Sequence, residues 1–153
     1  MSDEISAFIQ ASVPGGWFSG PPAVEADDEE ILVVGDLRVG QAVDAFRESS
    51  RQERMAIARE AESRFGRPVS WGVEHDGATT LFTTHSAPVM TRLRLRERAV
   101  LTTLIDAGIA RSRSEALAWC VKLVERHQAD WLSELREALS GVEQARVGGP
   151  SLI

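Results

Sequence analysis

The most constraining feature of this sequence is the stretch 91–120, which reads TRLRLRERAVLTTLIDAGIARSRSEALAWC. It begins with leucine and arginine in alternation, and successive side chains of a β-strand point to opposite faces. Residues 89–95 are therefore predicted to form a short strand with leucines on one face and arginines on the other. Helical spacing of apolar residues follows, so this strand must lead directly into helices.

A first helix is predicted from about Glu97 to Ala107, where apolar residues recur at helical spacing. Gly108 follows, and glycine readily takes the left-handed conformation in which helices commonly end. Ser112 and Glu115 then match the S-x-x-E capping box, in which each side chain bonds a backbone N–H of the first turn. A second helix is expected to begin there.

The second helix carries a heptad-like apolar series. From Leu117 to Val142 apolar residues recur at alternating spacings of four and three, with Gln128 in the one polar position. Such a seam is typical of a helix that packs against another helix. We expect this helix to continue, straight or with a bend near His127, to about Gly141.

The first 36 residues are expected to form a flexible acidic head. They contain eight acidic residues and no Lys or Arg, and prolines and glycines cluster between residues 14 and 22. Such composition buries little surface and breaks regular structure. The apolar run EILVV at 30–34 is the exception and predicts a strand.

Residues 37–88 are expected to form a helical region followed by a hairpin. Apolar spacing from Val39 to Phe65 is helical, and Ser50 with Glu53 matches a second capping box that would start a new helix. The head, this middle region and a C-terminal module at 89–147 are the three parts that we expect.

The hairpin is predicted from its turn. Asp76-Gly77 supplies the pair of positive φ angles that a type I′ turn needs, and strand-forming residues flank it on both sides. With that turn, Trp71 lies opposite Phe82. One face of the hairpin is therefore largely apolar.

Charge is unevenly distributed along the chain. The formal net charge is −6, yet the window 88–126 has eight bases and four acids, a local balance of +4. Net acidity disfavours a nucleic-acid partner, because DNA affinity relies on neutralising phosphates. The positive window favours one.

Cysteine usage and apolar runs bear on the compartment. Cys120 is the single cysteine, so no intrachain disulfide can form and a reducing compartment is the simpler assumption. No apolar run approaches the ~18 residues of a membrane span, and the start lacks a signal-peptide pattern. We expect a cytoplasmic protein without a membrane partner.

Catalytic and metal-binding patterns are missing from the sequence. His75, His85 and His127 lack the close spacing of metal ligands, and no Gly-rich phosphate loop or G-x-S-x-G motif occurs. Cys120 fits a small core residue better than a nucleophile. We therefore predict no enzyme, no metal and no cofactor.

The order of strand, helix, tight connection and capped helix, with ARSRSEAL as its most specific part, resembles the ribbon-helix-helix (Met repressor/Arc repressor-like) DNA-binding family. The resemblance covers about residues 89–126. It implies a homodimer whose strands pair into an antiparallel ribbon in the DNA major groove. The predicted fold class is α+β, mainly helical: a β-hairpin plus a ribbon-helix-helix-like module with an extended C-terminal helix.

The resemblance implies DNA contacts at two places. Met90, Arg92 and Arg94 would read bases from the ribbon, and arginine can bond guanine O6 and N7 bidentately in the major groove. The start of the second helix would hold a phosphate, because helix N-termini present backbone N–H groups and partial positive charge. The residues at that end are Arg111, Ser112, Arg113 and Ser114.

Two alternatives stay open. Strand 89–95 can pair with the same strand of a second copy, or with the strand at 81–85 of its own chain. The predicted function is a dimeric, sequence-specific transcriptional regulator or repressor that binds double-stranded DNA. The alternative is a protein-interaction module, antitoxin-like or an adaptor, which binds a second protein through the N-terminal region or the C-terminal helix.

Overall fold

The structure is a computed structural model that describes residues 2–149. The chain divides into two compact units between Val89 and Met90, and each is described by itself below. Among the described residues there are six α-helices and one four-stranded sheet, which confirms the mainly helical α+β fold class. None of the described helices has the length and apolar character needed to cross a bilayer.

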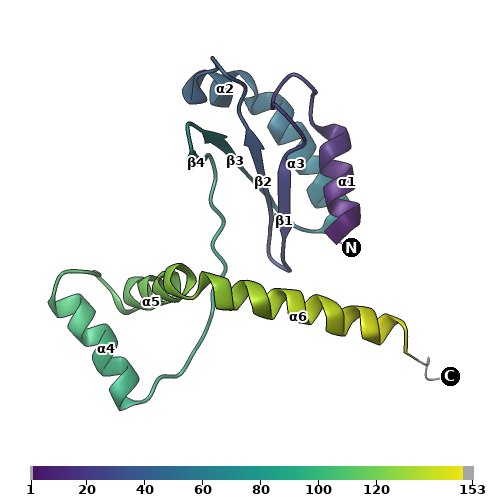
Figure 1. The fold of residues 1–153 in the computed structure, drawn as a ribbon. Coiled ribbons are helices and arrows are strands. Elements are labelled where there is room, and N and C mark those ends of the chain that lie inside the picture. Colours follow the sequence, from purple (N-terminus) through teal and green to yellow (C-terminus); the bar gives the residue numbers. More distant parts are fainter. Residues whose placement is uncertain (1, 150–153) are drawn as a thin grey trace. The chain divides into compact units, whose positions relative to one another are not determined.

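The N-terminal unit is a four-stranded sheet with three helices. Its elements are α1 (Ser2–Ser12), β1 (Ala23–Ala26), β2 (Ile31–Asp36), α2 (Val43–Ser49), α3 (Arg51–Phe65), β3 (Val69–His75) and β4 (Ala78–Leu81). The strand order is β1-β2-β3-β4 (Figure 1). The central pair β2/β3 is parallel and both outer pairs are antiparallel. Parallel neighbours need a crossover, which α2 and α3 supply.

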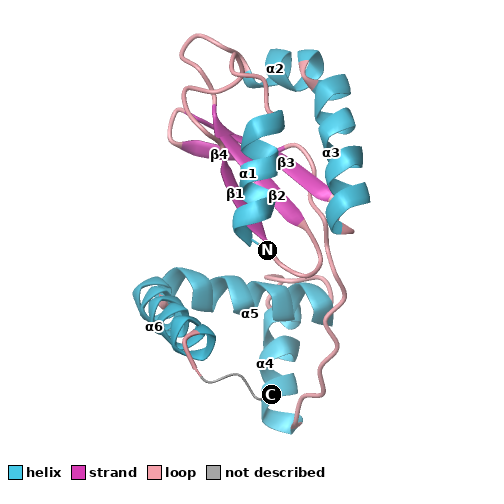
Figure 2. Cartoon of the chain, turned by 90° about the vertical axis from the view of Figure 1, so that its right-hand side faces the viewer, coloured by secondary structure: helices cyan, strands magenta, loops and turns pink. Residues whose placement is uncertain are grey.

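The core of this unit lies on one face of the sheet. Ile31 and Val33 of β2 and Val73 of β3 are fully buried in one cluster with Ile5 and Ile9 of α1. Figure 2 shows α1 and α3 lying against the sheet of this unit. Because strand side chains alternate, the helices cover only the face that carries these residues.

The prediction of a flexible acidic head at 1–36 is wrong. Residues 2–12 form α1, and Ile5 and Ile9, four positions apart, are both completely buried. Phe18, in the loop that follows, is also buried. Ile5 and Ile9 lie in a segment rich in acidic residues, shortly before the prolines. The composition of this segment therefore gave no sign of a buried helix. The strand predicted at 30–34 is confirmed as β2, which continues to Asp36.

The predicted helical region begins later than expected and is divided. Val39 is fully exposed and precedes α2, so it lies outside the helix. The break falls at Ser50 as predicted, but the capping box does not form. The Ser50 hydroxyl donates to the Phe46 carbonyl at 2.6 Å instead of accepting from Glu53.

The hairpin prediction is confirmed. Asp76 and Gly77 have φ angles of 50° and 75°, as a type I′ turn requires. The backbone N–H of Phe82 donates to the Trp71 carbonyl at 2.7 Å, which places these residues opposite each other. Both side chains are buried.

The C-terminal unit consists of α4 (Leu95–Asp106), α5 (Arg113–His127) and α6 (Ala129–Val147). Gly108, with φ of 75°, follows the end of α4 as predicted. The long second helix is interrupted at Gln128, so the option of a bend near His127 is correct. Figures 1 and 2 show α5 and α6 running in clearly different directions. The last helix continues past Gly141 to Val147.

The predicted strand at 89–95 is not a strand in the single chain. Residues 82–94 lie outside the helices and strands, and α4 begins already at Leu95. Within the described residues, the sheet ends at β4, whose only partner is β3. Pairing of 81–85 with 89–95 inside one subunit is therefore wrong, and pairing between two copies stays a prediction.

Candidate nucleic-acid interface

The three residues predicted to read bases lie on the extended segment before α4. Met90 is almost completely exposed, and Arg92 and Arg94 are exposed as well. Leu93, between the two arginines, is half-buried and packs against the core of the C-terminal unit. The predicted alternation of faces therefore holds only at residues 92–94: Leu95, predicted on the same face as Leu93, is 73% exposed and already begins α4.

The backbone at the end of this segment is fixed by the start of α4. Arg94 is the N-cap, and its backbone N–H donates to a carboxylate oxygen of Glu97 at 2.7 Å. The guanidinium of Arg98 donates to the Leu93 carbonyl at 2.6 Å. These bonds hold the chain so that the side chains of Arg92 and Arg94 extend into solvent.

The second predicted group lies at the start of α5. Ser112 is the N-cap, and its hydroxyl accepts the Glu115 backbone N–H at 3.1 Å. The Glu115 carboxylate accepts the N–H of Arg111 at 2.8 Å, one residue further back than a capping box prescribes. The helix start is therefore confirmed at the predicted position, with a shifted return bond.

A carboxylate thus lies beside the predicted phosphate site. The backbone N–H of Arg111 lowers the pKa of the Glu115 carboxyl, and the Arg111 guanidinium, 3.5 Å from it, adds to this effect. Arg111 is therefore partly engaged by Glu115. By helical geometry, the first-turn N–H groups of Arg113 and Ser114 have no acceptor inside the helix and remain able to bind an anion.

Both predicted groups lie on the exposed surface of the C-terminal unit. All seven residues of the two groups are exposed. Among the described residues of this unit, three are buried, namely Leu101, Ala110 and Ala116. Cys120 is half-buried and packs against them, which agrees with its interpretation as a core residue.

The helices α5 and α6 expose many large apolar side chains. The heptad series predicted part of this surface, but the exposed set is wider and includes both tryptophans of these helices. Its members are Trp119, Val121, Leu123, Val124, Trp131, Leu135, Leu139 and Val142. In the part of the chain that the structure describes, no residue of α6 is buried. We call this set of side chains the α5–α6 apolar surface. The described residues of the C-terminal unit do not cover it.

Comparison with known proteins follows the same division into two units. Residues 3–81 match the N-terminal domain of the Rv1265-like protein family, and residues 94–146 match the Mb1296 C-terminal domain. The chain belongs to the Rv1265-like protein family. Its relatives include the uncharacterized proteins Rv1265 of Mycobacterium tuberculosis and Mb1296 of Mycobacterium bovis. Each is 51% identical over 152 residues, spanning 92% of this chain and 67% of the relative.

No solved structure matches this member of the Rv1265-like family.

Proposed function

We propose that this protein is a dimeric, sequence-specific DNA-binding transcriptional regulator that reads bases through Arg92 and Arg94. One observation carries the proposal: both arginines are exposed on an extended segment while Leu93 between them packs inward. Two such segments side by side would form a two-faced ribbon, which fits the major groove and presents arginine to guanine.

The lack of a strand in one chain is compatible with this proposal. A ribbon needs two segments, because ladder hydrogen bonds run between neighbouring strands. Residues 89–94 are extended, lie outside the sheet of the N-terminal unit, and lead directly into α4. A second copy is the partner that would supply the missing strand.

The start of α5 has a positioning role in this proposal. Arg113 and the first-turn N–H groups would hold a backbone phosphate, which orients the protein without reading sequence. Glu115 shares this end of the helix and already engages Arg111. We therefore assign the phosphate contact chiefly to Arg113 and Ser114. Access to the chromosome places such a regulator in the cytoplasm of a bacterial cell.

A second candidate function is a protein-interaction module, antitoxin-like or an adaptor. The observation that favours it is the α5–α6 apolar surface, whose exposed tryptophans are typical of interface anchors. The net charge of −6 also weakens non-specific attraction to DNA. In this case a second protein would cover the surface, and DNA binding would be secondary or lost.

The test is selection of bound fragments from random genomic DNA by the purified full chain. Arg92→Ala or Arg94→Ala should each cost ~1–3 kcal/mol and relax base preference at one position per half-site. Arg113→Ala should weaken binding to all sequences about equally and reduce the salt dependence, because it removes a phosphate contact.

Arg126→Ala is the matched control, since Arg126 is exposed at the end of α5, outside both groups. It should leave base preference unchanged. Equal, sequence-independent losses for Arg92, Arg94 and Arg113 would reduce the site to a basic patch. Failure to enrich any fragment would favour the protein-interaction function.

A further inference from the structure

A hollow in the N-terminal unit gathers three arginines. It lies where α2 meets α3, beside the residues that follow β4, and has a volume of about 600 Å³. Its charged and aromatic lining consists of Asp44, Arg47, Glu48, Arg51, Arg54 and Phe82. None of these residues belongs to the candidate nucleic-acid interface.

The spacing of the arginines explains why they meet. Arg47, Arg51 and Arg54 are separated by four and three positions, which places them on one side of a helix. Figures 1 and 2 show that α2 and α3 run in different directions, yet the chain stays hydrogen-bonded through Ser50, whose carbonyl accepts the Arg54 N–H at 2.9 Å. All three arginines line one hollow at this junction. Three positive charges therefore line one side of the α2–α3 junction.

Arg54 is held rigidly in the wall of the hollow. The residue is only 6% exposed. Its Nε donates to the Ser50 hydroxyl and one terminal nitrogen, Nη2, donates to the Arg47 carbonyl, both at 2.9 Å. The guanidinium lies 4.8 Å from the centre of the Phe82 ring. All these partners are neutral, and a guanidinium has five N–H donors, so donors of the Nη1 side remain for a ligand.

The positive charge of this cluster has no acidic partner in direct contact. Asp44 and Glu48 line the same hollow, yet the ion pairs found among the described residues involve other arginines: Arg64 with Glu4, Arg67 with Asp28, and Arg111 with Glu115. Burial, followed by the charges of Arg47 and Arg51, lowers the pKa of the Arg54 guanidinium. Three arginines and two carboxylates line the hollow, so a net positive charge remains that a bound anion would balance.

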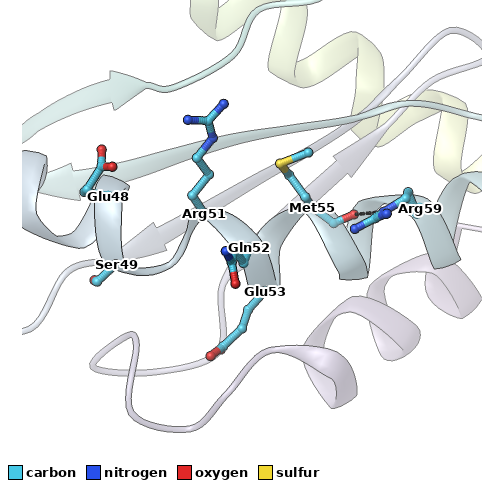
Figure 3. A pocket seen from close by; sticks show the side chains of 7 residues that line it. All are labelled: Glu48, Ser49, Arg51, Gln52, Glu53, Met55 and Arg59. Carbon is cyan, nitrogen blue, oxygen red and sulfur yellow. Dashed lines mark hydrogen bonds between the residues drawn. The ribbon is translucent and has the colours of Figure 1, made fainter.

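The neighbouring surface leaves Arg51 available. Figure 3 shows the adjoining hollow along α3, where the Arg51 guanidinium and the Glu53 carboxylate extend to opposite sides of the helix. Arg59, one turn further along than Met55, turns back to donate to the Met55 carbonyl at 3.2 Å. Arg51 therefore faces the arginine cluster's hollow, and Arg59 does not line it.

We propose that this hollow binds the phosphate group of a small phosphorylated molecule through Arg47, Arg51 and Arg54. Guanidinium forks match phosphate oxygens and can bond them bidentately. The ring of Phe82 packs against the guanidinium of Arg54 and so fixes the direction of its N–H donors. A volume of about 600 Å³ also exceeds what one phosphate ion fills and lies within the usual range for small-molecule sites. The proposal is independent of DNA binding, which we assign to the other unit.

The experiment titrates the full chain with inorganic phosphate, the probe, in a calorimeter at neutral pH. Sodium chloride and sodium acetate at matched ionic strength serve as reference anions. Phosphate should bind saturably at a site that depends on Arg51, and acetate should not bind there. Arg51→Gln should weaken the phosphate affinity about tenfold, because it removes one charge-assisted hydrogen-bond donor. Arg51 is exposed, so this variant keeps the fold.

Two further variants make the test specific. Arg59→Gln removes an exposed arginine from the same helix but outside the hollow, and it should bind phosphate like the unchanged chain. Arg54→Lys keeps the positive charge and loses the fork, so binding should fall while the circular dichroism spectrum stays unchanged. The proposal is overturned by a lack of saturable phosphate binding, by equal binding of acetate, or by equal losses in Arg51→Gln and Arg59→Gln.

Discussion

The two units of this chain differ sharply in how much each buries. Twelve apolar side chains form the buried cluster of the N-terminal unit, where helices cover one face of the sheet. Three of the described residues of the C-terminal unit are buried, and two of these are alanines. Burying a large apolar side chain contributes roughly 1.5–3 kcal/mol, so the larger buried cluster gives the N-terminal unit the larger hydrophobic stabilisation. We therefore expect the N-terminal unit to be the more stable of the two, and we propose that a partner covers the C-terminal unit.

The difference also separates two kinds of surface. The C-terminal unit exposes large side chains on α5 and α6, including Trp131 and Leu139, which are 52% and 62% exposed. The N-terminal unit exposes few, and its large aromatic residues pack against one another, as Trp17 and Phe46 do with ring centres 5.5 Å apart. The N-terminal unit thus has a buried apolar core, and the C-terminal unit leaves large apolar side chains exposed.

The largest expected effect is the loss of a core contact in the N-terminal unit. Ile9→Ala should lower the free energy of unfolding by about 2–5 kcal/mol, because Ile9 is fully buried and its loss leaves a cavity. Leu139→Ala, on the exposed face of α6, should cost within about 0.5 kcal/mol in dilute protein. Urea unfolding followed by circular dichroism measures both. A similar cost for both variants at low concentration would remove the contrast between the units.

A smaller effect is expected from two glycine replacements. A Cβ at Gly35 would lie 2.3 Å from an atom of the Phe18 ring, so Gly35→Ala should destabilise the N-terminal unit by about 1–3 kcal/mol. At Gly141 in α6, a Cβ meets nothing within 4 Å, so Gly141→Ala should stabilise its helix by up to about 1 kcal/mol. Thermal unfolding measures the change in stability of both variants. Opposite signs are expected, and tolerance of Gly35→Ala would show that Phe18 does not pack on β2.

The smallest effect concerns the pH dependence of the α5 cap. The pKa of Glu115 is lowered in the folded chain, chiefly by the Arg111 N–H. The ionised carboxylate therefore stabilises the fold above the pKa of unfolded glutamate, and this contribution is lost as the pH falls through the lower folded pKa. Glu115→Gln should remove this part of the acid dependence. Melting curves across the acidic range check it, and an unchanged pH profile would mean that the cap contributes nothing.

Short sequence patterns correctly predicted the turn and the helix start that depend only on neighbouring residues. The turn at Asp76-Gly77 and the helix start at Ser112 depend on residues within a few positions of one another, and both formed as predicted. Ser50 matched the same capping pattern but donates to Phe46 instead. There the chain comes directly from α2, and the backbone N–H groups of Ser50 and Arg54 donate to the carbonyls of Phe46 and Ser50.

Long-range pairings were beyond the sequence patterns. The parallel pairing of β2 with β3 brings together residues about 38 positions apart, such as Val33 and Trp71. The burial of Ile5 depends on the same sheet. The strand predicted at 89–95 did not form in the single chain, and the Glu97 carboxylate, which accepts the Arg94 N–H, begins α4 already at Leu95.

Of the two candidate sites, the sequence predicted the one before α4 and missed the arginine cluster of the N-terminal unit. Exposure of Met90, Arg92 and Arg94 followed from simple alternation and is observed. The arginine cluster of the N-terminal unit was missed, although its spacing was visible in the sequence. Charged residues on a helix usually form a solvated face, so their spacing alone does not indicate a site. The contact between Phe82 and the guanidinium of Arg54 depends on the folded structure.

Sedimentation equilibrium of the full chain tests the central claim most directly. If a second copy completes the C-terminal unit, the chain should sediment as a dimer at micromolar concentration and dissociate on dilution. Leu135→Asp should shift this equilibrium toward monomer, because it places a charge on the α5–α6 apolar surface, and Met55→Asp, a half-exposed site on the N-terminal unit, should not. A chain that stays monomeric at micromolar concentration would contradict both the ribbon and the comparison between the two units.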